Sequence, residues 1–216
     1  MKRILFVCIL GLVSFMTISS QTIKPRFGFG LSTFATSGGS IDTDVSSRFK
    51  IHLGATYEHE MNESLMFQTG LLFEGKGARE YGAVGSFSQE VIYNPVYMII
   101  PVAAKYYFSA NSDLQFFGNG GFYAGIGLGG KAKLTENDAG NIEKESAKVF
   151  STDALKRMDF GVEFGGGVIV PFSGMDVEFG MLLSFGLTNI GRSSNLNVNT
   201  LKNQAYKLYV AVPFSL

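Results

Sequence analysis

The chain alternates between apolar residues and polar or small residues over many short segments, and this alternation restricts the fold more than any other feature. In residues 48–58, for example, Phe49, Ile51 and Leu53 alternate with Lys50 and His52. A period of two residues places successive side chains on opposite faces of a β-strand. Eight segments carry this pattern, at residues 26–35, 48–58, 64–76, 91–108, 114–129, 157–171, 175–189 and 206–216. Each has about the length that a tilted strand needs to cross a bilayer.

The connections between these segments alternate between long and short. The long ones are residues 36–46, 77–90, 130–156 and 190–201, and the short ones are residues 60–62, 109–113 and 172–174. Outer-membrane β-barrels have short turns on the periplasmic side and longer loops on the external side. The sequence therefore predicts an all-β fold, an eight-stranded antiparallel up-and-down transmembrane β-barrel, with polar external loops and both termini on the periplasmic side.

The two faces of the predicted strands differ in polarity. One face is apolar, with residues such as Phe27, Phe29, Phe122 and Phe164. The other face carries twelve charged or titratable side chains: Arg26, Arg48, Lys50, His52, Glu58, Glu74, Lys76, Lys105, Asp159, Glu163, Asp176 and Glu178. A basic side chain on the lipid face of a barrel costs ~2–4 kcal/mol at the bilayer midplane. We therefore expect these twelve side chains to point inward and to form a charge network in the barrel interior.

Residues 1–20 have the layout of a secretory signal peptide, with a short basic start, an apolar run over residues 4–13 and a small, polar-leaning exit. We expect cleavage near Ser20 and Gln21, so that residues 21–216 form the barrel domain. The single cysteine, Cys8, lies inside the apolar run. The mature chain would then fold without a disulfide bond and without a cysteine-based zinc site.

The composition excludes several other classes of protein. The 18 basic and 18 acidic residues give a formal net charge of zero, which lacks the basic excess of a nucleic-acid-binding protein. A hydrophobic content of 46% argues against intrinsic disorder. A soluble barrel of the lipocalin kind has apolar side chains inside and polar ones outside. Because the longer apolar face here needs an apolar solvent, the expected partner is the lipid bilayer of the outer membrane, and no nucleic acid.

The predicted interior charges also bear on conduction. An eight-stranded barrel is just wide enough for side chains to fill it. An ion-selective pore usually shows a ring of charges of one sign, whereas the predicted interior mixes both signs. The sequence therefore favours a closed or poorly conducting bore, and a passive small-solute porin or channel is the alternative.

The histidines suggest no catalytic centre. His52 and His59, the two histidines, are separated by about 23 Å along one strand and cannot share a metal ion. Neither lies near the predicted external rim, where a lipid-modifying outer-membrane enzyme would need its histidine. We therefore expect no catalytic residue, metal or cofactor, and rank an enzyme third among the candidate functions.

Five tyrosines are predicted to form aromatic girdles at the membrane interfaces: Tyr93, Tyr97, Tyr106, Tyr107 and Tyr206.

Several stretches resemble the small, porin-like outer-membrane β-barrel proteins of the Bacteroidetes. They are residues 94–108, 157–168 and 182–190, together with the last alternating strand. The resemblance implies an outer-membrane location, and the family includes accessory barrels of the type IX secretion system. It implies no catalytic residues. The sequence thus predicts a non-enzymatic membrane barrel with a structural or interaction role, whose external loops are available to bind other envelope or secretion-machinery proteins.

Overall fold

A computed structural model describes residues 21–39, 44–108, 114–150, 155–191 and 198–215, so the predicted signal peptide lies outside the described residues. Every regular element in these ranges is a β-strand. The strands are β1 (Gln21–Gly39), β2 (Asp44–Glu60), β3 (Leu65–Gly75), β4 (Ala78–Val84), β5 (Phe87–Phe108), β6 (Gln115–Asp138), β7 (Asn141–Lys148), β8 (Met158–Phe172), β9 (Met175–Gly186), β10 (Val198–Ala211) and β11 (Phe214–Ser215). Within these ranges, no helix has the length and apolar character needed to span a membrane.

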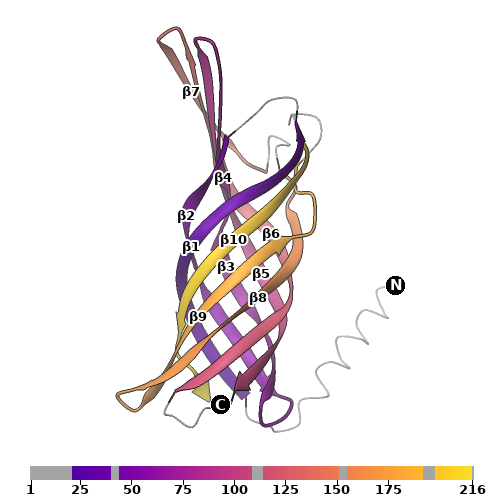
Figure 1. The fold of residues 1–216 in the computed structure, drawn as a ribbon, viewed down its shortest axis with the longest axis vertical. Coiled ribbons are helices and arrows are strands. Elements are labelled where there is room, and N and C mark those ends of the chain that lie inside the picture. Colours follow the sequence, from indigo (N-terminus) through magenta and orange to yellow (C-terminus); the bar gives the residue numbers. More distant parts are fainter. Residues whose placement is uncertain (1–20, 40–43, 109–113, 151–154, 192–197, 216) are drawn as a thin grey trace, which may run out of the picture.

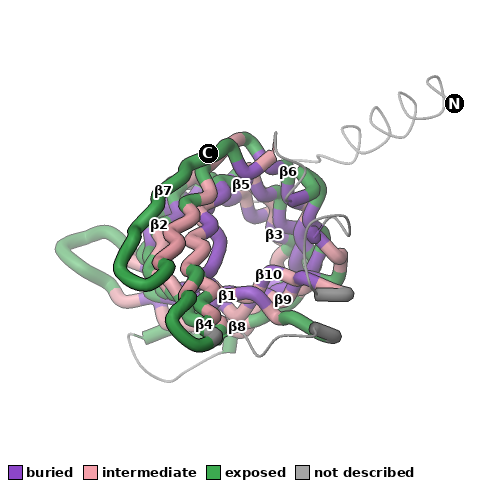
Figure 2. The backbone as a smooth tube through the Cα atoms, turned by 90° about the horizontal axis from the view of Figure 1, so that it is seen from above, coloured by how far each residue is buried: buried purple, intermediate pink, exposed green. Residues whose placement is uncertain are grey.

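Eight of the strands form a closed ring. Each of β1, β2, β3, β5, β6, β8, β9 and β10 pairs antiparallel with the next, and β10 pairs with β1 to close the ring. The closing register runs from Arg26 opposite Ala211 to Gly39 opposite Val198. The ring appears as an upright cylinder of tilted strands in Figure 1 and as a closed ring from above in Figure 2. The predicted eight-stranded up-and-down barrel is confirmed.

The prediction of long loops at residues 77–90 and 130–156 is wrong, because both segments consist largely of β-hairpins. In residues 77–90, β4 pairs with the first part of β5, and in residues 130–156, β7 pairs with the last part of β6. Both hairpins project from the same end of the barrel (Figure 1). Outside the membrane both faces of a strand meet water, so these segments lack the apolar alternation that reveals the barrel strands.

The short connections at the opposite end are tight turns. Ser173 and Gly174 join β8 to β9 with φ angles of 53° and 83°, the positive values that a two-residue type I′ turn requires. Between β2 and β3, the side-chain Oδ1 of Asn62 accepts hydrogen bonds from the backbone N–H groups of Ser64 and Leu65. The predicted turn at residues 109–113 lies outside the described residues.

The outer face of the barrel is apolar, as predicted. Phe27 and Phe122 expose 58% and 66% of their surface, and they are two of many large apolar side chains exposed on the barrel strands, an extended apolar surface of the kind that marks a membrane contact. The predicted tyrosine girdle is only partly present, since Tyr106 and Tyr206 are exposed whereas Tyr93, Tyr97 and Tyr107 are buried. Adjacent strand residues point to opposite faces, so Tyr106 and Tyr107 could not both have faced lipid.

The barrel interior contains apolar clusters toward both ends. Near the hairpin end, Phe34, Tyr93 and Leu201 pack with Val149, which follows β7, and with Leu155, which precedes β8. At the turn end, the cluster contains Tyr107, Phe117, Ile169, Leu182, Tyr209 and Ala211. Apolar side chains therefore occupy part of the interior toward both ends, as expected in an eight-stranded barrel.

Candidate functional site

The bore near the turn end holds a cluster of two lysines and two glutamates, here called the lower network. Lys24 of β1 places its Nζ 2.7 Å from Glu58 of β2 and 2.8 Å from Glu178 of β9. Lys105 of β5 lies 2.8 Å from Glu58 and 2.6 Å from Glu178. Each ammonium group thus contacts both carboxylates, and the four charges join four strands across the interior.

Neutral donors complete the lower network. The hydroxyl groups of Tyr107 and Tyr209 donate to Glu58 and Glu178 respectively, each at 2.8 Å. The side-chain amide of Gln68 donates to Glu58 at 2.8 Å. All these side chains are buried. A buried ion pair tolerates desolvation only when its remaining hydrogen-bonding positions are satisfied, and these three donors supply that satisfaction.

A second cluster, here called the upper network, lies closer to the hairpin end. Lys207 of β10 pairs with Glu74 at 2.7 Å and with Glu163, which also accepts a hydrogen bond from Ser184. Lys76 pairs with Asp159 at 2.9 Å. Asp159 also accepts hydrogen bonds from Asn203 at 2.8 Å, Tyr123 at 3.2 Å and Thr188 at 3.4 Å.

The buried charges in the described residues balance. Five cations are buried: Lys24, Arg26, Lys76, Lys105 and Lys207. Five carboxylates are also buried: Glu58, Glu74, Asp159, Glu163 and Glu178. The signs are interleaved in direct contacts and do not form a ring of one sign. At each lysine–carboxylate pair, both charges already have a partner of opposite sign, so a passing small ion would find no free charge there to bind.

The structure places most of the predicted interior residues together. Nine of the twelve are buried, and Arg48 and Lys50 are half-buried. Asp176 shares a face of β9 with Glu178, but it is exposed beside the Ser173–Gly174 turn, at the rim of a cavity of about 420 Å³ that Lys24 and Glu58 also line. The residue lies one position from the start of β9, where the barrel wall ends and water replaces the interior.

Two lysines of the networks are missing from the prediction. Lys24 lies before the predicted first strand at residue 26, but β1 begins at Gln21 and carries its side chain into the bore. Lys207 lies between the outward-facing Tyr206 and Leu208. The alternation of β10 was therefore a sufficient signal for Lys207, while Lys24 needed the correct start of β1.

Arg26 and His52 lie in the interior and form no ion pair with another residue that the structure describes. The Arg26 guanidinium stacks 3.9 Å from the centre of the Tyr209 ring, a cation–π contact that partly replaces hydration. Both ring nitrogens of His52 are buried without a hydrogen-bond partner among the described residues. No group of three or more His, Cys, Asp or Glu side chains in the described ranges is arranged to hold a metal ion.

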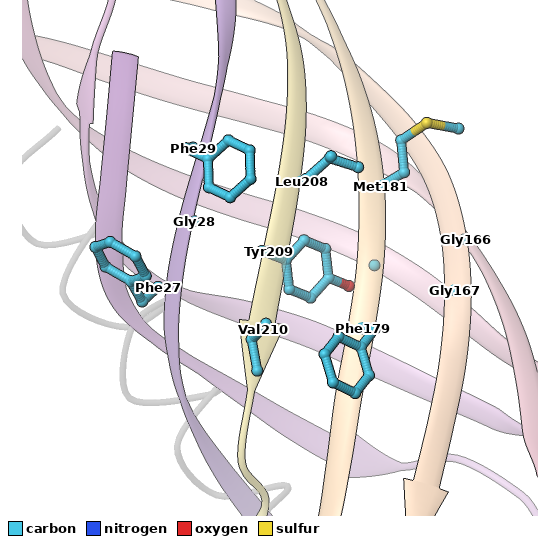
Figure 3. Close-up of a pocket in the computed structure, with 11 residues that line it drawn as sticks. Phe27, Gly28, Phe29, Gly166, Gly167, Phe179, Met181, Leu208, Tyr209 and Val210 are labelled. Carbon is cyan, nitrogen blue, oxygen red and sulfur yellow. The ribbon is translucent and has the colours of Figure 1, made fainter. Parts of the chain in front are cut away.

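The outer wall has an apolar hollow of about 560 Å³ across β1, β10, β9 and β8. Phe27 and Phe29 line it from β1, and Phe179 and Met181 line it from β9 on the other side of β10 (Figure 3). Glycines, which lack side chains, form much of its floor: Gly28, Gly166, Gly167 and Gly180. The apolar lining suits lipid hydrocarbon chains and supplies no group for catalysis.

The two projecting hairpins form one four-stranded sheet in the order β4, β5, β6 and β7. Residues that are direct partners across an antiparallel sheet share a face, so the register assigns each side chain. The face that continues the barrel interior, here called the axial acidic face, carries Glu80, Glu136, Asp138, Glu143 and Glu145. The opposite face, here called the outer basic face, carries Arg79, Lys131, Lys133, Lys144 and Lys148.

The opposite charges on the two faces are nearly unmixed. Among the described residues of these four strands, the outer basic face carries one carboxylate, Glu90, which pairs with Arg79 at 2.7 Å. Asp44 of β2, opposite Tyr81, adds a second at its margin. The axial acidic face carries no lysine or arginine over the same strands. Burial raises the pKa of Glu80 above its ordinary value, where this face approaches the barrel mouth.

The sequence match agrees with this architecture. Residues 19–192 match the family described as outer membrane protein beta-barrel domain. The chain belongs to this family. It is accordingly an outer-membrane β-barrel protein, which explains its exposed apolar belt. No curated protein matches the chain significantly.

Solved outer-membrane barrels resemble this barrel at low sequence identity. Ail, the attachment invasion locus protein of Yersinia pestis, is 13% identical, with 91% of this chain and 100% of that chain covered and a TM-score of 0.39. Neisserial surface protein A is 12% identical, with coverage of 89% and 97% and a TM-score of 0.45. OprG of Pseudomonas aeruginosa is 14% identical, with coverage of 91% and 96% and a TM-score of 0.44.

Proposed function

We propose that this outer-membrane barrel is a non-enzymatic membrane anchor with a closed bore, whose projecting sheet contacts other components of the cell envelope. The observation that carries the proposal is the lower network, in which Lys24 and Lys105 each contact both Glu58 and Glu178 across the interior. A signal peptide at residues 1–20 would export the chain. Short turns of outer-membrane barrels face the periplasm, so the projecting sheet would lie outside the cell.

The interaction role follows from the contrast between the two parts of the molecule. The barrel is narrow and filled with paired side chains, whereas β4 to β7 present two charged faces to water. Functional contacts of rigid scaffolds are concentrated on such projecting segments. Other envelope proteins, including secretion machinery, are the partners that this arrangement suits.

Trimming the β6–β7 hairpin tests the interaction role. Lys133 and Ser146 are direct partners, so an Asn-Gly turn can replace residues 134–145 without disturbing the barrel. We expect the trimmed chain to fold, with an unchanged shift in gel mobility on heating, and to lose its protein partner in affinity purification from gently crosslinked outer membranes. A stoichiometric partner that the trimmed chain retains, or a full chain that is purified alone, would contradict this role.

A passive pore for small solutes is the second candidate function. The cavity at the turn end, which Lys24 and Glu58 line, favours it because it opens the interior to water at that end. If the pore operates, liposomes that contain the pure barrel should swell in solutions of small sugars. If the bore is closed, swelling should match that of protein-free liposomes.

A further inference from the structure

The cavity of about 420 Å³ at the turn end of the barrel, here called the turn-end cavity, is enclosed on all sides and open to water at its mouth. Its lining residues come from β1, β2, β3, β5, β6, β8 and β9. Lys24 and Glu58 of the lower network form its floor. Its volume lies within the range of pockets that hold small molecules.

The floor of the turn-end cavity offers a ligand no free charge. Lys24 contacts Glu58 at 2.7 Å and Glu178 at 2.8 Å. Both carboxylate oxygens of Glu58 already accept hydrogen bonds within the lower network. Because breaking such a buried pair is costly, a ligand in this cavity has to be recognised by the rim and the walls.

The rim carries two carboxylates on opposite sides of the mouth. Glu63 lies in the turn between β2 and β3, and Asp176 lies at the start of β9, beside the turn from β8. Around the ring, β5 and β6 separate these two turns on one side, and β10 and β1 separate them on the other. Both side chains are exposed, and neither forms an ion pair with another described residue. The mouth therefore presents two separated negative charges.

The walls inside the rim are apolar beneath both carboxylates. Met66 of β3 lines the cavity on the side of Glu63, and Ile169 of β8 lines it on the side of Asp176. Both pack in the apolar cluster at the turn end. Ammonium groups form strong hydrogen bonds with carboxylates, while an aliphatic stem gains free energy when it leaves water for an apolar wall. The arrangement thus suits a ligand that is cationic at both ends and apolar between them.

We propose that the turn-end cavity binds a linear aliphatic diamine. One ammonium group pairs with Glu63 and the other with Asp176, and the methylene stem lies against Met66 and Ile169. Since the short turns of outer-membrane barrels face the periplasm, the ligand enters from the periplasm. This site lies at the end of the barrel opposite the projecting sheet, so it adds a binding role that the contacts of that sheet do not include.

NMR titration of the folded, full-length barrel with cadaverine, a linear diamine, tests the proposal in zwitterionic detergent through isotope-labelled methionine methyl groups. Met66 and Met175 line the cavity, whereas Met98 and Met158 lie elsewhere in the barrel wall. We expect the signals of the first two to shift. Cadaverine should bind about fivefold more tightly than 5-aminopentan-1-ol, which has the same stem but one ammonium group, because one partly exposed ion pair contributes up to about this factor.

Two variants assign this preference to the rim. Glu63→Gln and Asp176→Asn each remove one carboxylate, and each should lower the affinity for cadaverine to that for the amino alcohol. The matched control is Asp44→Asn, which makes the same change at an exposed position near the hairpin end. It should keep the fivefold preference. Gel mobility shifts on heating verify that every variant is folded.

Three results would overturn the proposal. The first is a titration in which the signals of Met66 and Met175 do not move. The second is equal affinity of the parent for the diamine and the amino alcohol, which would assign the cavity to a single basic group, such as a lysine of a periplasmic protein. The third is a preference for the diamine that survives both rim substitutions. None of these results depends on a partner of the projecting sheet or on conductance, so they are distinct from failure of the proposed function.

Discussion

The Glu178→Ala substitution should lower the free energy of unfolding of the barrel by about 3–5 kcal/mol, the usual effect of removing one partner from a buried ion pair. Glu178 accepts from Lys24, Lys105 and Tyr209, and its side chain is fully buried. Its removal leaves two ammonium groups to share Glu58. The loss of unfolding free energy should therefore come from the excess of buried positive charge, in addition to the missing contacts.

Urea unfolding of the barrel in lipid vesicles measures this effect through the gel mobility of the folded and unfolded forms, because the chain has no tryptophan to report by fluorescence. Asp176→Ala is the matched control. Asp176 also lies in β9, two residues before Glu178, but it is exposed. We expect its unfolding midpoint to be close to that of the parent chain. Equal midpoints for the two variants would show that the lower network contributes nothing to stability.

The second large effect concerns Lys76 and Asp159 in the upper network. Either Lys76→Met or Asp159→Leu alone leaves one charge unpaired in the interior, and each should lower the unfolding free energy by about 3–5 kcal/mol. The double variant should be destabilised by about as much as one single variant, because no uncompensated charge remains. Asn203 and Tyr123 then lose an acceptor, so we do not expect full recovery.

The measurement is a double-mutant cycle from urea unfolding in lipid vesicles. The predicted coupling energy is the sum of the two single losses minus the loss of the double variant, about 3–5 kcal/mol, which is at or above the upper end of the usual range for contacting residues. Destabilisations that add without coupling would mean that the 2.9 Å contact between Lys76 and Asp159 carries no net interaction.

The sequence predicts the barrel because a membrane imposes a strong pattern. Wherever a strand passes through lipid, one face must be apolar and the other can hold charges, so Phe27 and Phe29 alternate with Arg26 and Gly28. The projecting hairpins lack this constraint. Water on both faces of β7 leaves all eight of its residues exposed, and its alternation is one of charge sign, with Glu143 and Glu145 on one face and Lys144 and Lys148 on the other.

The interior contacts could be predicted only in part. Alternation indicates which side chains face inward, but it does not indicate their height along the barrel axis. Lys24 and Glu178 are 154 residues apart in sequence and meet because of the barrel closure and the strand registers. The tyrosines show the same limit, since composition suggests a lipid interface whereas position in the strand directs Tyr107 toward Glu58.

The central claim is that the interior side chains close the bore, and single-channel recording from the pure, full-length barrel in planar bilayers tests it most directly. Both networks contain paired charges that would have to separate for ions to pass. We predict no steady conductance above that of the protein-free bilayer. A large and steady single-channel conductance from protein whose folded state has been verified by gel mobility would contradict the claim and assign the barrel to the passive pores.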